Sequence, residues 1–419
     1  MMTKSQEIIN RFDNSVISNY GRFDLVISRA YEFEVFDIEG RRYLDMGFGI
    51  AVNCLGHCHP ELKDCLTQQM ESLDHVSNLY YYENQAQLAE NISHRLGGGK
   101  VFFCNSGAES NEAIIKLARR FGHNEGRYKI ITAENSFHGR TLATIAATGQ
   151  QKVKTGFGPA VEGFSHIPFG DLSAFENSID EKTAAILIEG VQGEGGLTTA
   201  SAEYLREIRN ICNEENILFL MDGVQCGMFR TGKFQSIQRI LDLNSEDQTN
   251  WLPDAISMGK SLAGGFPIGA LWAGSKTKDI LEAGSHGTTY GGNPLACAVS
   301  NKVFEIIQRD NLDKNIRDME ILLRKNLESI KSEFSQSILS IRGLGFMTGI
   351  VLNPESPIFK SLNGVTPSIY VTKKIQEMGM LVIPAGPHVV RFLPAYNIGP
   401  KQIDEAIGIL RKSMQHIHE

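Results

Sequence analysis

The sequence predicts an α/β fold whose main sheet is mostly parallel. Between about residues 100 and 275, short apolar runs rich in strand-forming residues alternate with helical or glycine-rich stretches. This alternation is typical of a parallel sheet covered by helices. After about residue 300 the pattern changes to long amphipathic helices followed by further strands, which indicates a second, smaller α+β domain.

The first 50 residues are predicted to form a β-hairpin that joins the smaller domain. Residues 26–46, VISRAYEFEVFDIEGRRYLDM, read as strands that turn at Glu39-Gly40. The strands expected for the main sheet follow, in the sequences VFFCN, KIITA, AAILIE, ILFLMD, DAISM and GALWA.

A long helix is predicted from Gly107 to Phe121. Its apolar residues recur at helical spacing and form one stripe that faces the sheet: Ala113, Ile114, Leu117, Ala118 and Phe121. Two more helical patterns, ACAVSNKVFEIIQRD and NIRDMEILLRKNLESIKSEF, precede the strand-like ILSIRGLGFMTGIVL and VVRFLPA. We therefore place the large domain at residues 51–300 and the small domain at residues 1–50 and 301–419.

Composition excludes several classes of protein. The 419 residues are 42% hydrophobic and 21% charged, and no apolar run approaches the roughly 20 residues of a membrane-spanning helix. With 41 basic and 48 acidic side chains, the net charge of −7 and the absence of a basic block argue against nucleic acid as a partner. The N-terminal segment does not resemble a secretory signal, and the seven cysteines are irregularly spaced, so we expect a cytoplasmic protein with free thiols.

The junction between a strand and the long helix is a candidate phosphate site. The strand VFFCN leads directly into Ser106, Gly107 and Ala108, where free backbone N–H groups meet the positive end of the helix. An ordinary helix with a serine N-cap would use the same residues. This feature alone leaves both interpretations open.

Two further side chains stand at the ends of predicted strands. Asp222 ends the apolar run ILFLM, where it is either a functional carboxylate with a cationic partner or a helix cap or structural salt bridge. Lys260 follows the next strand, DAISM, in a glycine-rich turn, where a lysine can form a Schiff base once burial lowers its pKa. A solvated loop lysine is the alternative for this feature alone. A phosphate cradle, a carboxylate and an imine-forming lysine together describe a pyridoxal phosphate site.

The chain resembles the class III pyridoxal-phosphate aminotransferases, and among them the acetylornithine aminotransferases, over nearly its whole length. The motifs that carry the resemblance are GHCHPEL (56–62), SNLYY (77–81), NSGAESNEA (105–113), SFHGRTLA (136–143), IEGVQGEGG (188–196), DGVQCGMFRTGKF (222–234), SMGKSLAGGFPIGA (257–270) and HGTTYGGNPLA (286–296). The resemblance implies transferase fold type I, with seven strands in a mostly parallel sheet.

The resemblance also implies roles for the cofactor site. Lys260 carries pyridoxal phosphate as an imine and, once freed, moves a proton between substrate and cofactor, while Asp222 keeps the ring nitrogen protonated. Gln225 is expected near the phenolic oxygen, and Phe137 stacks on the ring unless it is a core residue. The expected phosphate contacts are Ser106, Gly107, Ala108 and, from the neighbouring subunit of a homodimer, Thr289.

Three further residues are matched to substrate binding. Arg140 corresponds to the arginine that binds the carboxylate of acetylornithine far from the reacting amine, and Arg391 to the one that binds the α-carboxylate of glutamate and 2-oxoglutarate. Glu194 is expected to pair with Arg391 when no carboxylate is present. The implied reaction converts N2-acetyl-L-ornithine and 2-oxoglutarate to N-acetylglutamate 5-semialdehyde and glutamate in arginine biosynthesis. Succinylornithine, ornithine, 4-aminobutyrate or an acyl-diaminopimelate precursor remain alternative donors.

The sequence departs from the family pattern at several positions. Gly190 replaces the usual proline, Gly223 a glutamate, Phe229 a glycine and Gly259 an alanine, and residues 238–251 are an insertion expected to add a helix and a loop. The two replacements Gly190 and Gly223 motivate an alternative, a cofactor- or metal-binding protein on the same fold that does not transaminate.

Two other readings stay open beside the aminotransferase. A semialdehyde aminomutase is a third possibility, although retention of Arg391 with Glu194 counts against it. Four residues, Cys54, His57, Cys58 and His59, are close in sequence and could suggest zinc. Their spacing is not CxxC and no second ligand pair follows, so we expect no metal.

Overall fold

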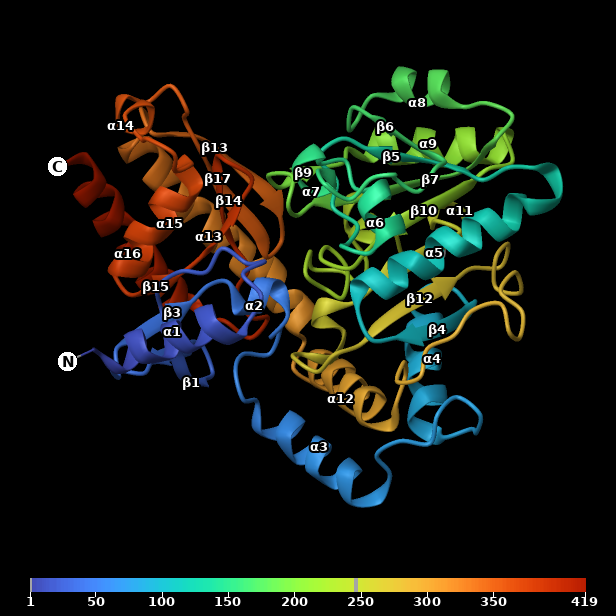
Figure 1. Ribbon diagram of the computed structural model, residues 1–419, viewed down its shortest axis with the longest axis horizontal. Coiled ribbons are helices and arrows are strands. Elements are labelled where there is room, and N and C mark those ends of the chain that lie inside the picture. The colour runs from blue at the N-terminus through green and yellow to red at the C-terminus, as the bar shows by residue number, and fades with distance from the viewer. Residues whose placement is uncertain (1, 245–247) are drawn as a thin grey trace.

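The central sheet of the protein has seven strands in the order β4-β12-β11-β10-β7-β5-β6. The computed structural model describes residues 2–244 and 248–419 (Figure 1). The strands are β4 (Lys100–Cys104), β5 (Lys129–Ala133), β6 (Phe164–Ile167), β7 (Thr183–Glu189), β10 (Leu218–Asp222), β11 (Ala255–Met258) and β12 (Gly269–Ala273). Strand β12 is antiparallel to both its neighbours, and the other pairs in this sheet are parallel. The predicted α/β fold with a mostly parallel seven-stranded sheet is confirmed.

Helices cover both faces of this sheet because its strands are apolar on both sides. Leu187 and Leu220 cluster with α5 (Gly107–Gly122) on one face. Ile186 and Phe219, the adjacent residues of the same strands, belong to the cluster on the opposite face. That cluster also contains residues of α4 (Glu83–His94), α8 (Leu172–Ser178), α9 (Ala202–Glu214) and α12 (Pro294–Arg309).

Helix α5 has the stripe that its sequence predicts. Ala113, Ile114, Leu117 and Ala118 are buried, and Phe121 packs against the same cluster. Ser106 is the N-cap, and its hydroxyl accepts a hydrogen bond from the backbone N–H of Glu109. The helix therefore begins at the carboxyl end of β4 and points its N-terminus at the edge of the sheet.

Two smaller sheets are built from the chain ends. One has the order β13-β14-β17-β16, and the other, β1-β2-β3-β15, joins N-terminal strands to a C-terminal one. Their strands are β1 (Ile27–Tyr31), β2 (Glu34–Asp37), β3 (Arg42–Asp45), β13 (Ile338–Leu344), β14 (Met347–Leu352), β15 (Met380–Leu381), β16 (Ile383–Ala385) and β17 (Val389–Phe392). The hairpin turn at Glu39-Gly40 is confirmed, and Gly40 adopts a φ of +89° there. Domain limits near residues 50 and 300 remain our proposal.

The remaining elements complete the two ends and the connections. The helices are α1 (Lys4–Ser15), α2 (Phe48–Ala51), α3 (Pro60–Ser72), α6 (Leu142–Ala147), α7 (Gln151–Lys154), α10 (Ser236–Ile240), α11 (Gln248–Trp251), α13 (Leu312–Glu333), α14 (Pro357–Lys360), α15 (Pro367–Glu377) and α16 (Pro400–His418). The short pieces are η1 (His123–Glu125), η2 (Lys260–Ala263), β8 (Val191–Gln192) and β9 (Thr198–Thr199). The insertion includes parts of α10 and α11, while its residues 245–247 lie outside the described residues. In the described ranges no helix is long and apolar enough to cross a membrane.

Candidate active site

A cavity of about 240 Å³ opens where the carboxyl ends of five sheet strands meet. Ligands bind at this edge in open α/β sheets because strand ends and helix N-termini converge there. The lining residues are Gly107, Ala108, Asn111, Phe137, His138, Gly139, Arg140, Glu189, Glu194, Asp222, Val224, Gln225, Cys226 and Lys260. Eight of the eleven residues predicted for the site therefore line one cavity.

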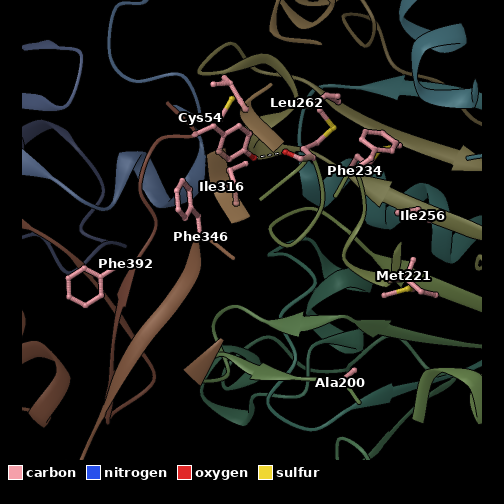
Figure 2. Close-up of a cluster of buried hydrophobic side chains, with 14 of the residues drawn as sticks. Cys54, Ala200, Met221, Phe234, Ile256, Leu262, Ile316, Phe346 and Phe392 are labelled. Carbon is pink, nitrogen blue, oxygen red and sulfur yellow. Dashed lines mark hydrogen bonds between the residues drawn. The ribbon is translucent and has the colours of Figure 1, made fainter. Parts of the chain in front are cut away.

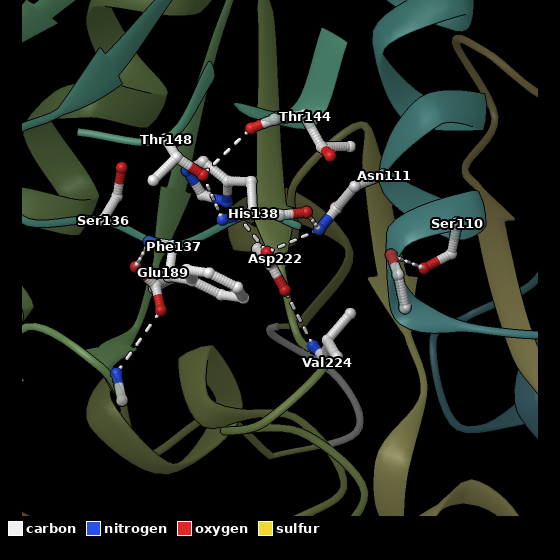
Figure 3. A network of polar contacts seen from close by, with 12 residues as sticks. Ser110, Asn111, Ser136, Phe137, His138, Thr144, Thr148, Glu189, Asp222 and Val224 are labelled. Carbon is white, nitrogen blue, oxygen red and sulfur yellow. Dashed lines mark hydrogen bonds and ion pairs between the residues drawn. The ribbon is translucent and has the colours of Figure 1, made fainter. Parts of the chain in front are cut away.

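Asp222 is held at the end of β10 by three hydrogen bonds (Figure 3). Its Oδ2 contacts Asn111 Nδ2 at 2.7 Å and His138 Nδ1 at 2.8 Å, and its Oδ1 accepts from the Val224 backbone N–H at 2.9 Å. Sequence reasoning missed both side-chain partners. Both could have been found from the sequence, because Asn111 is a polar residue on the buried face of α5 and His138 lies in the FHGR motif.

Glu189 is a second carboxyl group beside Asp222 that the sequence analysis did not single out. The two residues are paired in register at the ends of the parallel strands β7 and β10. Glu189 accepts hydrogen bonds from the backbone N–H groups of Phe137 at 3.2 Å and Gly193 at 3.4 Å. Burial, and next the negative charge of Asp222, raise its pKa well above the ordinary carboxyl value.

Lys260 occupies the first position of η2 with a left-handed backbone, at a φ of +46°. A lysine rarely adopts this conformation, and such strain is frequent at functional sites. Burial lowers the pKa of the Lys260 amine. The charged groups that act on the amine are Glu194, Asp222 and Glu189, which raise its pKa, and Arg391, which lowers it.

Arg391 and Glu194 form an ion pair beside the cavity. The distance between Arg391 Nη2 and Glu194 Oε1 is 2.6 Å, and Arg391 Nη1 donates to Gly193 O and Gln225 Oε1 at 2.9 Å each. Burial favours the neutral acid of Glu194, but the nearby positive charges of Arg391 and Lys260 outweigh it and lower the Glu194 pKa. The sequence analysis expected this pairing, and the structure has it.

Arg140 lines the cavity beside Phe137. Its guanidinium carbon is 5.4 Å from the centre of the Phe137 ring, within cation–π range. Arg140 forms no ion pair within the described part of the chain, so its charge is available to an anionic ligand.

Ser106, Thr289 and Arg391 do not line the cavity. Ser106 caps α5, and Arg391 contacts two residues that line the cavity. Thr289 is exposed in the loop before α12. A role for Thr289 in this site would require a neighbouring subunit.

The residues present fit pyridoxal phosphate. The first helical turn of α5 lacks internal acceptors for its N–H groups, and Gly107 and Ala108 face the cavity, which suits a phosphate. Asp222 presents a hydrogen-bonded carboxylate for a protonated ring nitrogen, and Lys260 presents an amine with a lowered pKa. A flat ring fits beside the Phe137 side chain.

The His/Cys-rich stretch at 54–59 is engaged in other contacts. His57 Nε2 lies 2.8 Å from Asp45 Oδ2, and the buried thiol of Cys54 contacts the Ser261 carbonyl at 3.4 Å. Among residues 2–244 and 248–419, no three His, Cys, Asp or Glu side chains are grouped as a metal site.

Comparison with known proteins agrees with the fold. A family model described as aminotransferase class-III matches residues 16–414. The acetylornithine aminotransferase of Thermosynechococcus vestitus is 42% identical over 97% of this chain and 96% of its own length. The chain belongs to the class III aminotransferases, enzymes that depend on pyridoxal phosphate.

Solved structures show the same likeness. An ornithine aminotransferase from Toxoplasma gondii, described with partial occupancy of PLP at its active site, has a TM-score of 0.89 at 27% identity, covering 99% of this chain and 95% of that one. Acetylornithine aminotransferase from Elizabethkingia anophelis has a TM-score of 0.83 at 28% identity, covering 99% of this chain and 100% of that one.

Proposed function

We propose that this chain is a cytoplasmic, homodimeric enzyme that uses pyridoxal phosphate to move the terminal amino group of N2-acetyl-L-ornithine to 2-oxoglutarate. The products are N-acetylglutamate 5-semialdehyde and glutamate, and the reaction serves arginine biosynthesis. Support comes from the relatives named above and from the cavity. The observation that carries the proposal is the Glu194–Arg391 pair, because it allows one site to accept two unlike substrates.

The two substrates differ in what lies next to the reacting carbon. Glutamate has an α-carboxylate there, whereas the terminal amine of acetylornithine stands on a CH₂ group. A free Arg391 would favour only the carboxylate-bearing substrate, since an unpaired buried cation is costly. Glu194 neutralises the Arg391 cation when acetylornithine is bound. When glutamate is bound, Glu194 moves away and the glutamate α-carboxylate pairs with Arg391.

Arg140 binds the distant carboxylate in both cases. It lines the same cavity as Glu194, makes no ion pair of its own in the described chain and can form two parallel hydrogen bonds with a carboxylate. Donors that lack this distant carboxylate should therefore react poorly.

The cofactor, when bound, supplies an electron sink for the carbon next to the reacting amine. Gly107 and Ala108 would hold its phosphate, Phe137 its ring face, and Asp222 its ring nitrogen. Gln225 would approach its phenolic oxygen. His138 and Asn111 orient the Asp222 carboxylate through the hydrogen bonds at Oδ2.

Lys260 moves the proton. Its Nζ has a lowered pKa because it is buried, so the neutral amine that can accept a proton is more accessible than for an exposed lysine. The nearby Glu194 and Asp222 carboxylates stabilise the ammonium form that results. Lys260 Nζ would accept the proton from the substrate carbon next to the reacting amine and would then donate it to the cofactor side of the same bond system.

The first test is the visible absorption spectrum of the purified protein during half-reactions without a keto acid. We expect acetylornithine and glutamate to bleach the cofactor band at lower concentrations than ornithine or 4-aminobutyrate. Lys260→Ala should remove the band of the lysine-bound cofactor. Lys276→Ala is the matched control, because burial also lowers the Lys276 pKa but that side chain does not line the cavity.

Two outcomes would overturn the proposal. A Lys260→Ala protein that keeps the wild-type band would assign the cofactor to another residue. A wild-type band that no amine bleaches would exclude transamination, whereas bleaching by 4-aminobutyrate or ornithine in preference to acetylornithine would exclude only the proposed donor.

A further inference from the structure

Arg230 is a completely buried arginine without a carboxylate partner in the described chain. The other deeply buried arginines have one: Arg209 pairs with Asp254 at 3.1 Å, and Arg391 pairs with Glu194. Cys54 and Tyr396 are titratable side chains that interact with Arg230, and burial raises the pKa of both, that of Cys54 to about 12. Neither supplies a negative charge. Because a buried, uncompensated charge is costly, its presence needs a reason.

The side chain of Arg230 joins three distant segments. Its Nη1 donates to Pro394 O, and its Nη2 makes longer contacts to Ala51 O at 3.5 Å and Ser261 Oγ at 3.4 Å. Its guanidinium lies over the Tyr396 ring, 4.6 Å from the centre. Each acceptor is neutral, so the contacts fix positions of the backbone without neutralising the charge.

The contact with Ser261 reaches the neighbour of Lys260. Ser261 directly follows Lys260, and its hydroxyl donates to Ala51 O at 2.7 Å, the same carbonyl that Arg230 contacts. The thiol of Cys54 contacts the Ser261 carbonyl at 3.4 Å. Ser261 is therefore held on both its side chain and its backbone.

Several residues in or next to the segments that Arg230 contacts have strained backbone conformations. Non-glycine residues with left-handed φ angles include Ala51 at +63°, Lys260 at +46°, and Met228 and Phe229, which precede Arg230, at +50° and +65°. Such conformations persist only where surrounding contacts determine them. The Arg230 contacts bind the segments in which this strain is stored.

The contact with Pro394 reaches the other side of the active site. Pro394 lies three residues after Arg391, just beyond β17. The Arg230 carbonyl also accepts from Phe346 N at 2.9 Å, in the turn between β13 and β14. Figure 2 shows Cys54, Leu262 and Phe346, which come from three separate parts of the chain, in one core.

We propose that Arg230 is a positioning residue that fixes the left-handed backbone at Lys260 and the segment carrying Arg391 relative to each other. Lys260 lines the cavity and Arg391 contacts two residues that line it, Gln225 and Glu194. Lys260 and Arg391 come from different parts of the chain, so their separation depends on what connects those parts. Arg230 connects them through neutral carbonyl and hydroxyl groups, and its uncompensated charge is retained for these contacts. The substrate part of this inference rests on the proposed function, and the Lys260 part does not.

The test separates positioning from stability. Arg230→Met removes every polar contact of the Arg230 side chain. Ser261→Ala removes the hydroxyl that contacts Arg230 and Ala51 O, and it keeps the test available if the first variant fails to fold. Arg209→Met is the control, because it also deletes a buried arginine, leaves Asp254 unpaired and lies away from the cavity. All three are compared by thermal unfolding.

The main readout is chemical labelling of Lys260 in the cofactor-free, full-length chain by an amine-acylating reagent, followed by peptide mapping across pH. Release of the Lys260 backbone lets water reach the amine, which favours the ammonium ion and raises the midpoint of the labelling curve. We expect a rise of about one pH unit, or about a tenfold lower labelling rate at fixed pH, in Arg230→Met, and a smaller rise in Ser261→Ala.

The second readout is kinetic. Arg230→Met should raise KM for glutamate and 2-oxoglutarate, which use Arg391, more than KM for the donor whose reacting end has no carboxylate. The proposal is overturned if the pH midpoint of Lys260 labelling moves no more in the Arg230 and Ser261 variants than in Arg209→Met. Arg230 would then be a structural residue. A wild type that shows no transamination would refute the proposed function, yet the labelling result would still decide the role of Arg230.

Discussion

Glu189 and Asp222 end neighbouring strands beside one cavity, where two negative charges would be costly. Asp222 has a histidine and an asparagine as partners, whereas Glu189 has only backbone N–H groups. Burial, and next the negative charge of Asp222, raise the Glu189 pKa well above the ordinary carboxyl value, so Glu189 keeps its proton to a higher pH than an exposed glutamate does. While Glu189 is neutral, it does not compete with Asp222 for the proposed ring nitrogen.

This arrangement predicts a pH-dependent stability for Glu189→Gln. The folded chain keeps a proton that the unfolded chain releases above the ordinary carboxyl value of 4.5, so Glu189 reduces stability progressively as pH rises from there. Glutamine has nearly the same shape as glutamate, but its side chain has no proton to release in this pH range. We expect the midpoint of thermal unfolding of Glu189→Gln, relative to wild type, to rise by about 1 to 2 °C per pH unit above pH 4.5.

Circular dichroism melts at several pH values would measure this difference. The exposed Glu176→Gln on α8 is the control, and its difference from wild type should stay flat. A flat difference for Glu189→Gln as well would mean that Glu189 is ionised in the folded chain.

The residues of the cavity that were predictable are those whose chemistry is local in the sequence. Asp222 ends an apolar strand and Lys260 follows one. A charged side chain at such a position is unusual in the sequence alone, before its spatial neighbours are known. Asn111, His138 and Glu189 gain their significance only from contact with Asp222, across separations of 111, 84 and 33 residues. Sequence patterns report periodicity along one element and not such contacts.

At the scale of elements, the two unusual glycines are accommodated by the residues at the N-terminus of α10, Gln235 and Ser236. A side chain at Gly223 would bring its Cβ to 2.5 Å from Gln235 Oε1, and one at Gly190 would bring it to 2.3 Å from Ser236 Oγ. Both contacts are too short. Gln235 and Ser236 thus fill the space that larger residues would take, and the turn carrying Asp222 stays packed.

Gly223→Ala should therefore destabilise the protein by about 1 to 3 kcal/mol through overpacking. Gln235→Ala in the same chain should recover part of this loss, but not all, because the added Cβ also lies 3.0 Å from the Ser257 carbonyl. Chemical unfolding of both single variants and the double variant would measure the coupling.

Gly408→Ala is the control for the same substitution. Gly408 lies within α16, and an added Cβ there would meet nothing within 4 Å, so helix propensity should make this variant more stable. Additive effects of Gly223→Ala and Gln235→Ala would contradict the packing explanation.

The antiparallel strand β12 shows where element prediction was incomplete. Ten residues, 259–268, separate it from β11, and a parallel crossover usually needs a dozen or more. The short connection favours a strand that returns in the opposite direction. The parallel remainder of the sheet follows from longer connections that contain helices, which the alternating pattern predicts.

At the scale of the whole molecule, apolar side chains are exposed near the loop that carries Thr289. Leu79 is 82% exposed, Tyr81 fully exposed and Tyr290 63% exposed. Asn78 Nδ2 donates to Gly291 O at 3.0 Å, which joins the two segments. The expected homodimer would cover this surface and bring Thr289 to a neighbouring site.

Tyr81→Glu should weaken that dimer, because a charge would be buried without a partner. Sedimentation velocity should show a dimer for wild type and a larger monomer fraction for the variant, together with weaker cofactor retention. Ile321→Glu, at a residue 70% exposed on α13, is the control and should remain dimeric. A wild type that sediments as a monomer would refute the shared-site arrangement.

The pairing of β3 with β15 has a consequence for synthesis of the chain. Residues 42–45 leave the ribosome long before residues 380–381, which complete their sheet. Until then the free edge of β3 has backbone groups available to any other extended chain. Nascent chains are therefore most vulnerable to aggregation through their N-terminal strands, and the last tenth of translation closes that edge.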